Sequence, residues 1–91
     1  MRLEVTDIGM ANAAQVAAAG LEAIRAGDAA FDLSSVRTCD SSAVAVVLAW
    51  RREAQARGLA LTLAGLPAGL VSLAGVYGVD SLLDLAPSPA A

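Results

Sequence analysis

Residues 29–50 read AAFDLSSVRTCDSSAVAVVLAW, and this stretch decides the fold. Its first five residues are nearly continuous in apolar character, which is typical of a central parallel strand covered on both faces. The next segment, residues 34–39, is polar and predicts a loop. Asp-Ser-Ser at 40–42 then supplies N-cap chemistry for a helix that continues through Arg57.

The flanking sequence repeats this alternation of strand and helix. Apolar and polar residues alternate imperfectly over residues 3–8 and clearly over 59–64, as expected of strands. Pro67 suits the first residue of a further helix, and Gly58 and Gly27 suit helix ends. The expected elements are, in order, strands at 3–8, 29–33 and 59–64, and helices at 12–26, 40–57 and from 67 onward.

The helix at 12–26 carries two local signals. Asn12 followed by Gln15 is typical of a capping box. Gly20 inside the helix costs about 1 kcal/mol relative to alanine, so we expect a close approach to the sheet at this position.

This order predicts one small α/β domain, with helices packed on a short, mostly parallel sheet and right-handed crossovers. We expect the domain to occupy residues 1–85 and residues 86–91 to form a flexible tail. Partners of such sheets bind at the carboxyl ends of the strands, where the segment between residues 33 and 40 lies. The candidate site is therefore sought there.

Composition and charge exclude several classes of function. The net charge is −3, and without a basic cluster the chain lacks the electrostatic attraction that supplies most nucleic-acid affinity. The longest apolar run, residues 43–50, is too short to insert across a membrane, and we expect no signal peptide. The single cysteine, Cys39, fits a reducing compartment.

Catalytic and metal-binding signals are weak. The chain contains no histidine, so a Ser-His-Asp triad and the usual zinc sites are ruled out. Cys39 is read as a small packing residue rather than a reactive thiol. We therefore expect no enzyme activity, no metal and no cofactor.

The helix that follows Asp40 is apolar on more than one face. Val44, Val47 and Leu48 form one stripe, and Val46 and Trp50 form a second stripe rotated from the first. A helix lying on a sheet needs one apolar face, so the second stripe either meets a partner or is covered by a neighbouring helix of the same domain.

The residues 31–36 and 39–48, FDLSSV and CDSSAVAVVL, resemble the signature of the STAS family, in which an aspartate and a Ser or Thr open a helix. Residues 58–66 and 73–79 resemble the later strand and helix of the family's MlaB-like members. The first strand of the family's N-terminal hairpin is missing. This truncation leaves a strand edge at residues 3–8 that is a candidate for self-association.

The resemblance implies a partner-binding role. Ser41 takes the place of the family's phosphorylatable serine or of the unphosphorylated threonine of MlaB-like members. It implies a cytoplasmic subunit that binds the ATPase of a phospholipid-transporting ABC complex, at the cytoplasmic face of the inner membrane. The alternative is an anti-sigma-factor antagonist that a serine kinase switches by phosphorylating Ser41. The predicted partner interface comprises Thr38, Asp40, Ser41, Ser42, Val46 and Trp50.

Overall fold

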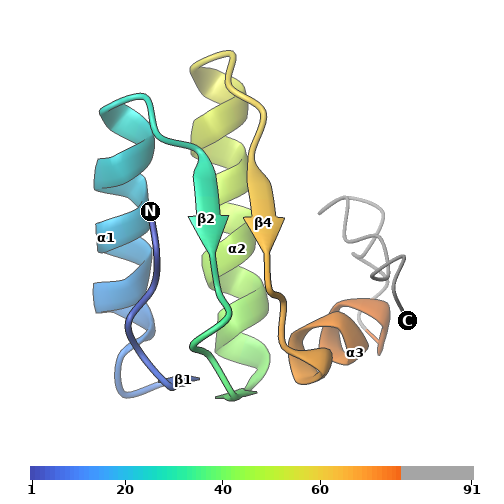
Figure 1. The fold of residues 1–91 in the computed structure, drawn as a ribbon. Helices are drawn as coiled ribbons and strands as arrows, with labels where there is room; N and C mark the ends of the chain where they lie inside the picture. The colour runs from blue at the N-terminus through green and yellow to red at the C-terminus, as the bar shows by residue number, and fades with distance from the viewer. Residues whose placement is uncertain (77–91) are drawn as a thin grey trace.

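A computed structural model describes residues 1–76 (Figure 1). The predicted α/β class is confirmed, with helices packed on short parallel strands. The elements run in the order β1 (Asp7–Ile8), α1 (Ala13–Arg25), β2 (Ala30–Asp32), β3 (Thr38–Cys39), α2 (Ser41–Ala56), β4 (Thr62–Ala64) and α3 (Ala68–Val76). The predicted tail and the end of the domain near residue 85 lie outside the described residues.

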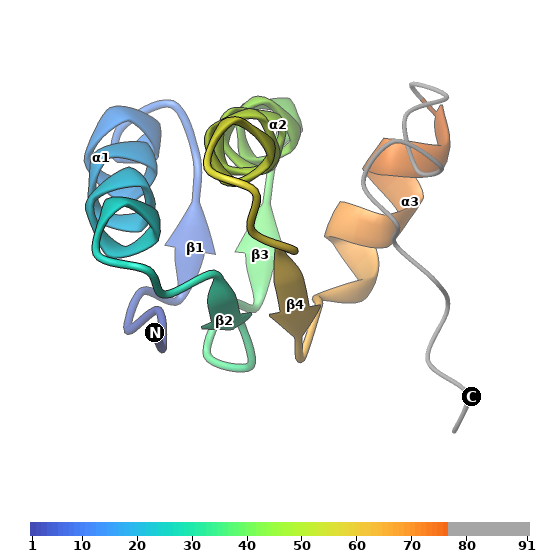
Figure 2. The same ribbon diagram turned by 90° about the horizontal axis from the view of Figure 1, so that it is seen from above.

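The strands are short, and they form two parallel pairs. β2 pairs with β4, and β1 pairs with β3, all in parallel. An isolated parallel bridge between Arg2 and Asp32 joins the N-terminal segment to β2. The segment at residues 1–8 therefore lies beside residues 30–39, and it forms one edge of the sheet (Figure 2).

The sequence reasoning missed β3, which was expected to be part of a polar loop. Thr38 and Cys39 pair with Asp7 and Ile8. A two-residue strand has no periodicity of its own to detect. β3 forms because it pairs with β1, which lies much earlier in the chain.

Both long helices lie on the same face of the strands, as Figure 2 shows from above. Burial along β2 alternates accordingly: Phe31 is buried, Ala30 is exposed and Asp32 is half-buried. The expectation that this strand is covered on both faces was wrong for the described residues. Ala30 and Asp32 expose little apolar surface, so the face of β2 that is turned away from the helices can be exposed to solvent.

The contact between α1 and α2 depends on Gly20 and Trp50. A Cβ atom placed on Gly20 would come within 2.1 Å of the Trp50 indole nitrogen. That nitrogen donates a hydrogen bond to the Ala17 carbonyl at 3.1 Å, and the ring meets Phe31 edge-on with centroids 4.9 Å apart. Gly20 therefore makes a close approach to a helix, not to the sheet as expected.

Asn12 begins α1 without the predicted capping box. Its side-chain oxygen accepts a hydrogen bond from the Gly9 N–H, and its amide donates to the Asp7 carbonyl. Asn12 thus holds the loop between β1 and α1 instead of capping the helix through its side chain.

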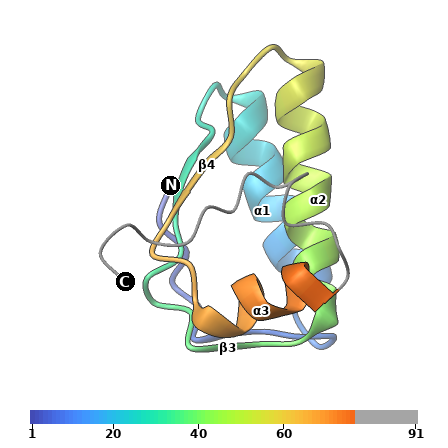
Figure 3. The same cartoon turned by 90° about the vertical axis from the view of Figure 1, so that its right-hand side faces the viewer.

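The third helix closes the end of the molecule where β3 and α2 meet (Figure 3). It begins at Ala68, and the Pro67 carbonyl accepts a hydrogen bond from the Leu70 N–H at 3.0 Å. Leu70 is fully buried and Leu73 packs against the core. α3 therefore brings its first turn close to Cys39, where Gly69 lies.

Candidate partner-binding site

The carboxyl ends of β1 and β3 bring two loops together at one rim of the domain. β1 leads into the loop at residues 9–12, and β3 leads into the start of α2. A Cβ atom on Gly9 would lie 3.2 Å from Asp40 Oδ2, so this glycine allows the first loop to approach Asp40 closely. The rim is thus built from segments about thirty residues apart in the chain.

Asp40 is the N-cap of α2, and it belongs to the Asp-Ser-Ser segment at 40–42 that predicted the cap. Its Oδ1 accepts a hydrogen bond from the Ser42 backbone N–H at 2.8 Å and another from the Ser42 hydroxyl. The bonds from the Ser42 hydroxyl and then from its N–H lower the pKa of the Asp40 carboxyl, with a smaller contribution from the Met10 backbone. Asp40 is thereby held ionised as a cap.

Ser41 occupies the first position of α2 and is exposed. Because the Ser42 hydroxyl donates its hydrogen bond to Asp40, Ser41 is the serine of this pair whose side chain is left exposed at the rim. Thr38 is also exposed, at the start of β3. Thr38, Asp40, Ser41 and Ser42 therefore lie at one rim of the domain, and their role in binding a partner stays a prediction.

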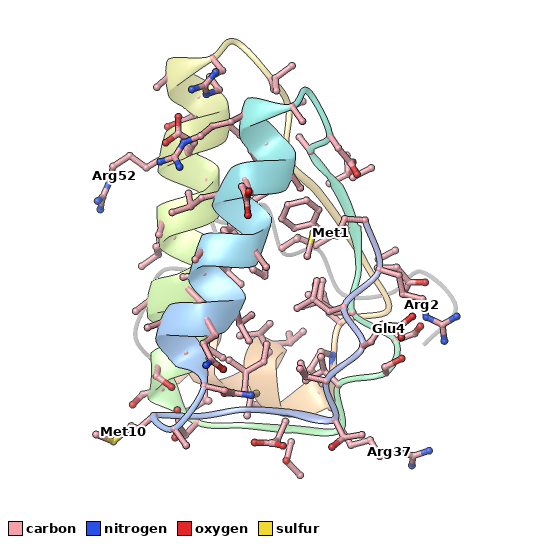
Figure 4. The ribbon with its side chains drawn as sticks, turned by 90° about the vertical axis from the view of Figure 1, so that its left-hand side faces the viewer. Met1, Arg2, Glu4, Met10, Arg37 and Arg52 are labelled. Carbon is pink, nitrogen blue, oxygen red and sulfur yellow. The ribbon has the colours of Figure 1, made fainter. Side chains whose placement is uncertain are left out.

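Met10 is a rim residue that the sequence reasoning missed. Its side chain is 88% exposed, and it projects from the loop between β1 and α1 (Figure 4). A large apolar residue directly after a predicted strand, in a loop at the carboxyl end of a parallel sheet, was the signal available. An exposed methionine adapts readily to an apolar partner surface.

Val46 and Trp50 do not belong to this surface. Trp50 is fully buried against α1 and Val46 is 4% exposed, so the prediction that this stripe meets a partner was wrong. The alternative holds, because a neighbouring helix covers Trp50. The exposed residues of α2 on the rim side are instead Ser41 and Ala45.

Cys39 behaves as a packing residue at the base of the rim. It is partly buried and packs against the core. Burial, and secondarily the neighbouring Asp40 carboxylate, raise the pKa of the Cys39 thiol. The thiol therefore stays protonated at neutral pH, and it lacks the lowered pKa that makes a cysteine a reactive nucleophile.

The charge on Asp40 makes the cap sensitive to acid. Because its folded-state pKa lies below the ordinary 3.8, its charge stabilises the fold above that pH, and the stabilisation disappears as pH falls through the lower folded value. Asp40→Asn keeps a capping oxygen. We expect the melting temperature of the wild type to exceed that of Asp40→Asn at pH 7, and this difference to close below about pH 3.8. A difference in melting temperature that did not depend on pH would contradict a stabilising role for the Asp40 charge.

The fold and rim define an α/β interaction domain in which a capped helix presents a serine at the carboxyl ends of parallel strands. A family model described as "Mlab, STAS domain" matches residues 2–84, and the chain belongs to this STAS family. A search of curated proteins found no match to the chain. No helix in residues 1–76 is long and apolar enough to cross a membrane.

Proposed function

We propose that this domain is a non-catalytic accessory subunit that binds the ATPase of a phospholipid-transporting ABC complex, at the cytoplasmic face of the inner membrane. Membership of the MlaB-like STAS family supports this class of role. The observation that carries the proposal is an exposed Ser41 at the start of a capped helix, together with the 88% exposed Met10 in the loop whose backbone reaches the Asp40 carboxylate.

The rim has the chemistry of a small protein interface. Met10 supplies an exposed apolar side chain, and Ser41 and Thr38 supply exposed hydroxyls. Interfaces of this kind depend on a few central apolar side chains with polar groups at the margin. The ATPase is expected to enclose Met10 in an apolar pocket and to hydrogen-bond Ser41.

The second candidate function is an anti-sigma-factor antagonist, and the exposure of Ser41 favours it. A phosphate on Ser41 would sit at the positive end of the α2 dipole, where negative charge is stabilised. The adjacent Asp40 carboxylate would oppose it, and the added charge would eject the domain from its kinase. Ser41 would then act as the phospho-acceptor.

Substitutions at the rim test the first proposal. Met10→Glu and Ser41→Glu each place a charge in the contact, and we expect each to raise the Kd for the purified ATPase by at least about tenfold. Both side chains are exposed in the free domain, so folding should be unaffected. Biolayer interferometry with the immobilised ATPase provides the measurement.

Gln55→Glu serves as the matched control, because Gln55 is exposed near the other end of α2. It adds the same charge away from the rim and should bind like wild type. Unchanged binding by both rim variants would contradict the proposal. A mass gain of about 80 Da on Ser41 with a partner kinase and ATP would instead support the antagonist.

A further inference from the structure

Within the part of the chain that the structure describes, the N-terminal segment is hydrogen-bonded on its inner side only. The Leu3 N–H donates to the Asp32 carbonyl at 2.9 Å, and the Asp32 N–H donates to the Met1 carbonyl at 2.8 Å. Because backbone groups alternate in direction along a strand, Arg2 and Glu4 turn their N–H and C=O groups outward. Within residues 1–76, no strand pairs with this outer side (Figure 2).

The side chains of this edge also alternate. Leu3 points into the core and is 3% exposed, whereas Arg2 and Glu4 are exposed and project from the opposite face, as Figure 4 shows. Among residues 1–76, the one hydrogen bond of the Arg2 side chain is a long one, at 3.4 Å, to the Ser35 hydroxyl. The edge thus carries one positive and one negative charge, symmetrically placed about Leu3.

We propose that this edge pairs with the same edge of a second copy of the chain. The two strands run antiparallel with Leu3 opposite Leu3, and a twofold axis passes between them. Arg2 of each copy then lies opposite Glu4 of the other, and each such pair exchanges backbone N–H···O bonds. The two sheets become one continuous sheet.

Charge selects this register over its neighbours. A twofold axis at Arg2 would place Arg2 opposite Arg2, and an axis at Glu4 would place Glu4 opposite Glu4. Like charges directly opposite each other destabilise a strand pair, and opposite charges stabilise it. Only the register centred on Leu3 matches every charge, so the edge is complementary to itself.

A groove beside this edge offers apolar area to the second copy. It encloses about 250 Å³ between the N-terminal segment and α1, and its apolar walls come from Leu3, Val5, Val16 and Ala19. In the proposed register, the side chains of Leu3 and Val5 of the second copy point to the face of the sheet on which this groove lies, because residues two apart in a strand share a face. The paired edge is short, so we expect a weak dimer with a micromolar Kd.

Charge reversal tests the register by sedimentation equilibrium over about 10 µM to 1 mM protein. Wild type should dimerise. E4R creates two pairs of facing positive charges, one on each side of the twofold axis, and R2E creates two pairs of facing negative charges, so each variant alone should dimerise at least about tenfold more weakly. Mixing R2E with E4R restores opposite charges, and the mixture should form heterodimers close to wild-type affinity.

R2E also places a negative charge near Asp32, whose pKa is lowered first by hydrogen bonds from Ser34 and to a smaller extent by the Arg2 charge, so circular dichroism must confirm that this variant folds. E4R is the decisive single variant, since no hydrogen bond or ion pair within residues 1–76 involves the Glu4 side chain. Monomeric wild type at 1 mM, unimpaired dimerisation of E4R, or no heterodimer from two folded variants would each overturn the proposal. Met10→Glu should dimerise normally, which separates this surface from the ATPase site.

Discussion

Trp50→Ala is expected to lower the free energy of unfolding by about 3–5 kcal/mol, the usual range for removing a buried large aromatic side chain. The indole is fully buried, and it contacts Phe31 edge-on and hydrogen-bonds to α1. Because domains are stabilised by roughly 5–15 kcal/mol, this one change removes a large share of the total. Urea denaturation followed by circular dichroism measures the loss.

Arg52→Ala is the control on the same helix, since Arg52 is exposed. Its effect should stay within about 0.5 kcal/mol. If Trp50→Ala proved as mild as Arg52→Ala, the indole would not hold α1 and α2 together as described. A mild effect of Trp50→Ala would then also indicate that the Trp50 side chain is exposed on the surface.

Gly20→Ala is expected to destabilise the domain by about 1–3 kcal/mol, although alanine is the better helix former. The new Cβ would lie 2.1 Å from the Trp50 indole nitrogen, and a buried ring has little room to move. The clash therefore outweighs the gain of about 1 kcal/mol in helix propensity. Chemical denaturation again gives the stability.

A double-mutant cycle isolates the cause of this effect. In the Trp50→Ala background the clash is absent, so Gly20→Ala should become neutral or stabilise by up to about 1 kcal/mol. The reversal of sign is the diagnostic result. Equal destabilisation in both backgrounds would show that something other than the indole excludes a side chain at position 20.

The sequence by itself determined the α/β class and the order of the main elements. Apolar periodicity reports the face that a segment buries, and glycine and proline mark where helices end and begin, so these features are local. The Asp-Ser-Ser segment at 40–42 likewise predicted the start and the capping of a helix, because side-chain capping involves residues two apart in the chain. This part of the site therefore follows from neighbouring residues alone.

The tertiary structure alone decided what covers the second apolar stripe of α2 and which residues joined the rim. Trp50 is covered because Gly20, thirty residues earlier, leaves space for its ring. Met10 becomes part of the site only because β1 pairs with β3 and carries its loop to Asp40. Contacts between distant segments depend on packing of the whole chain, and local patterns carry no information about them.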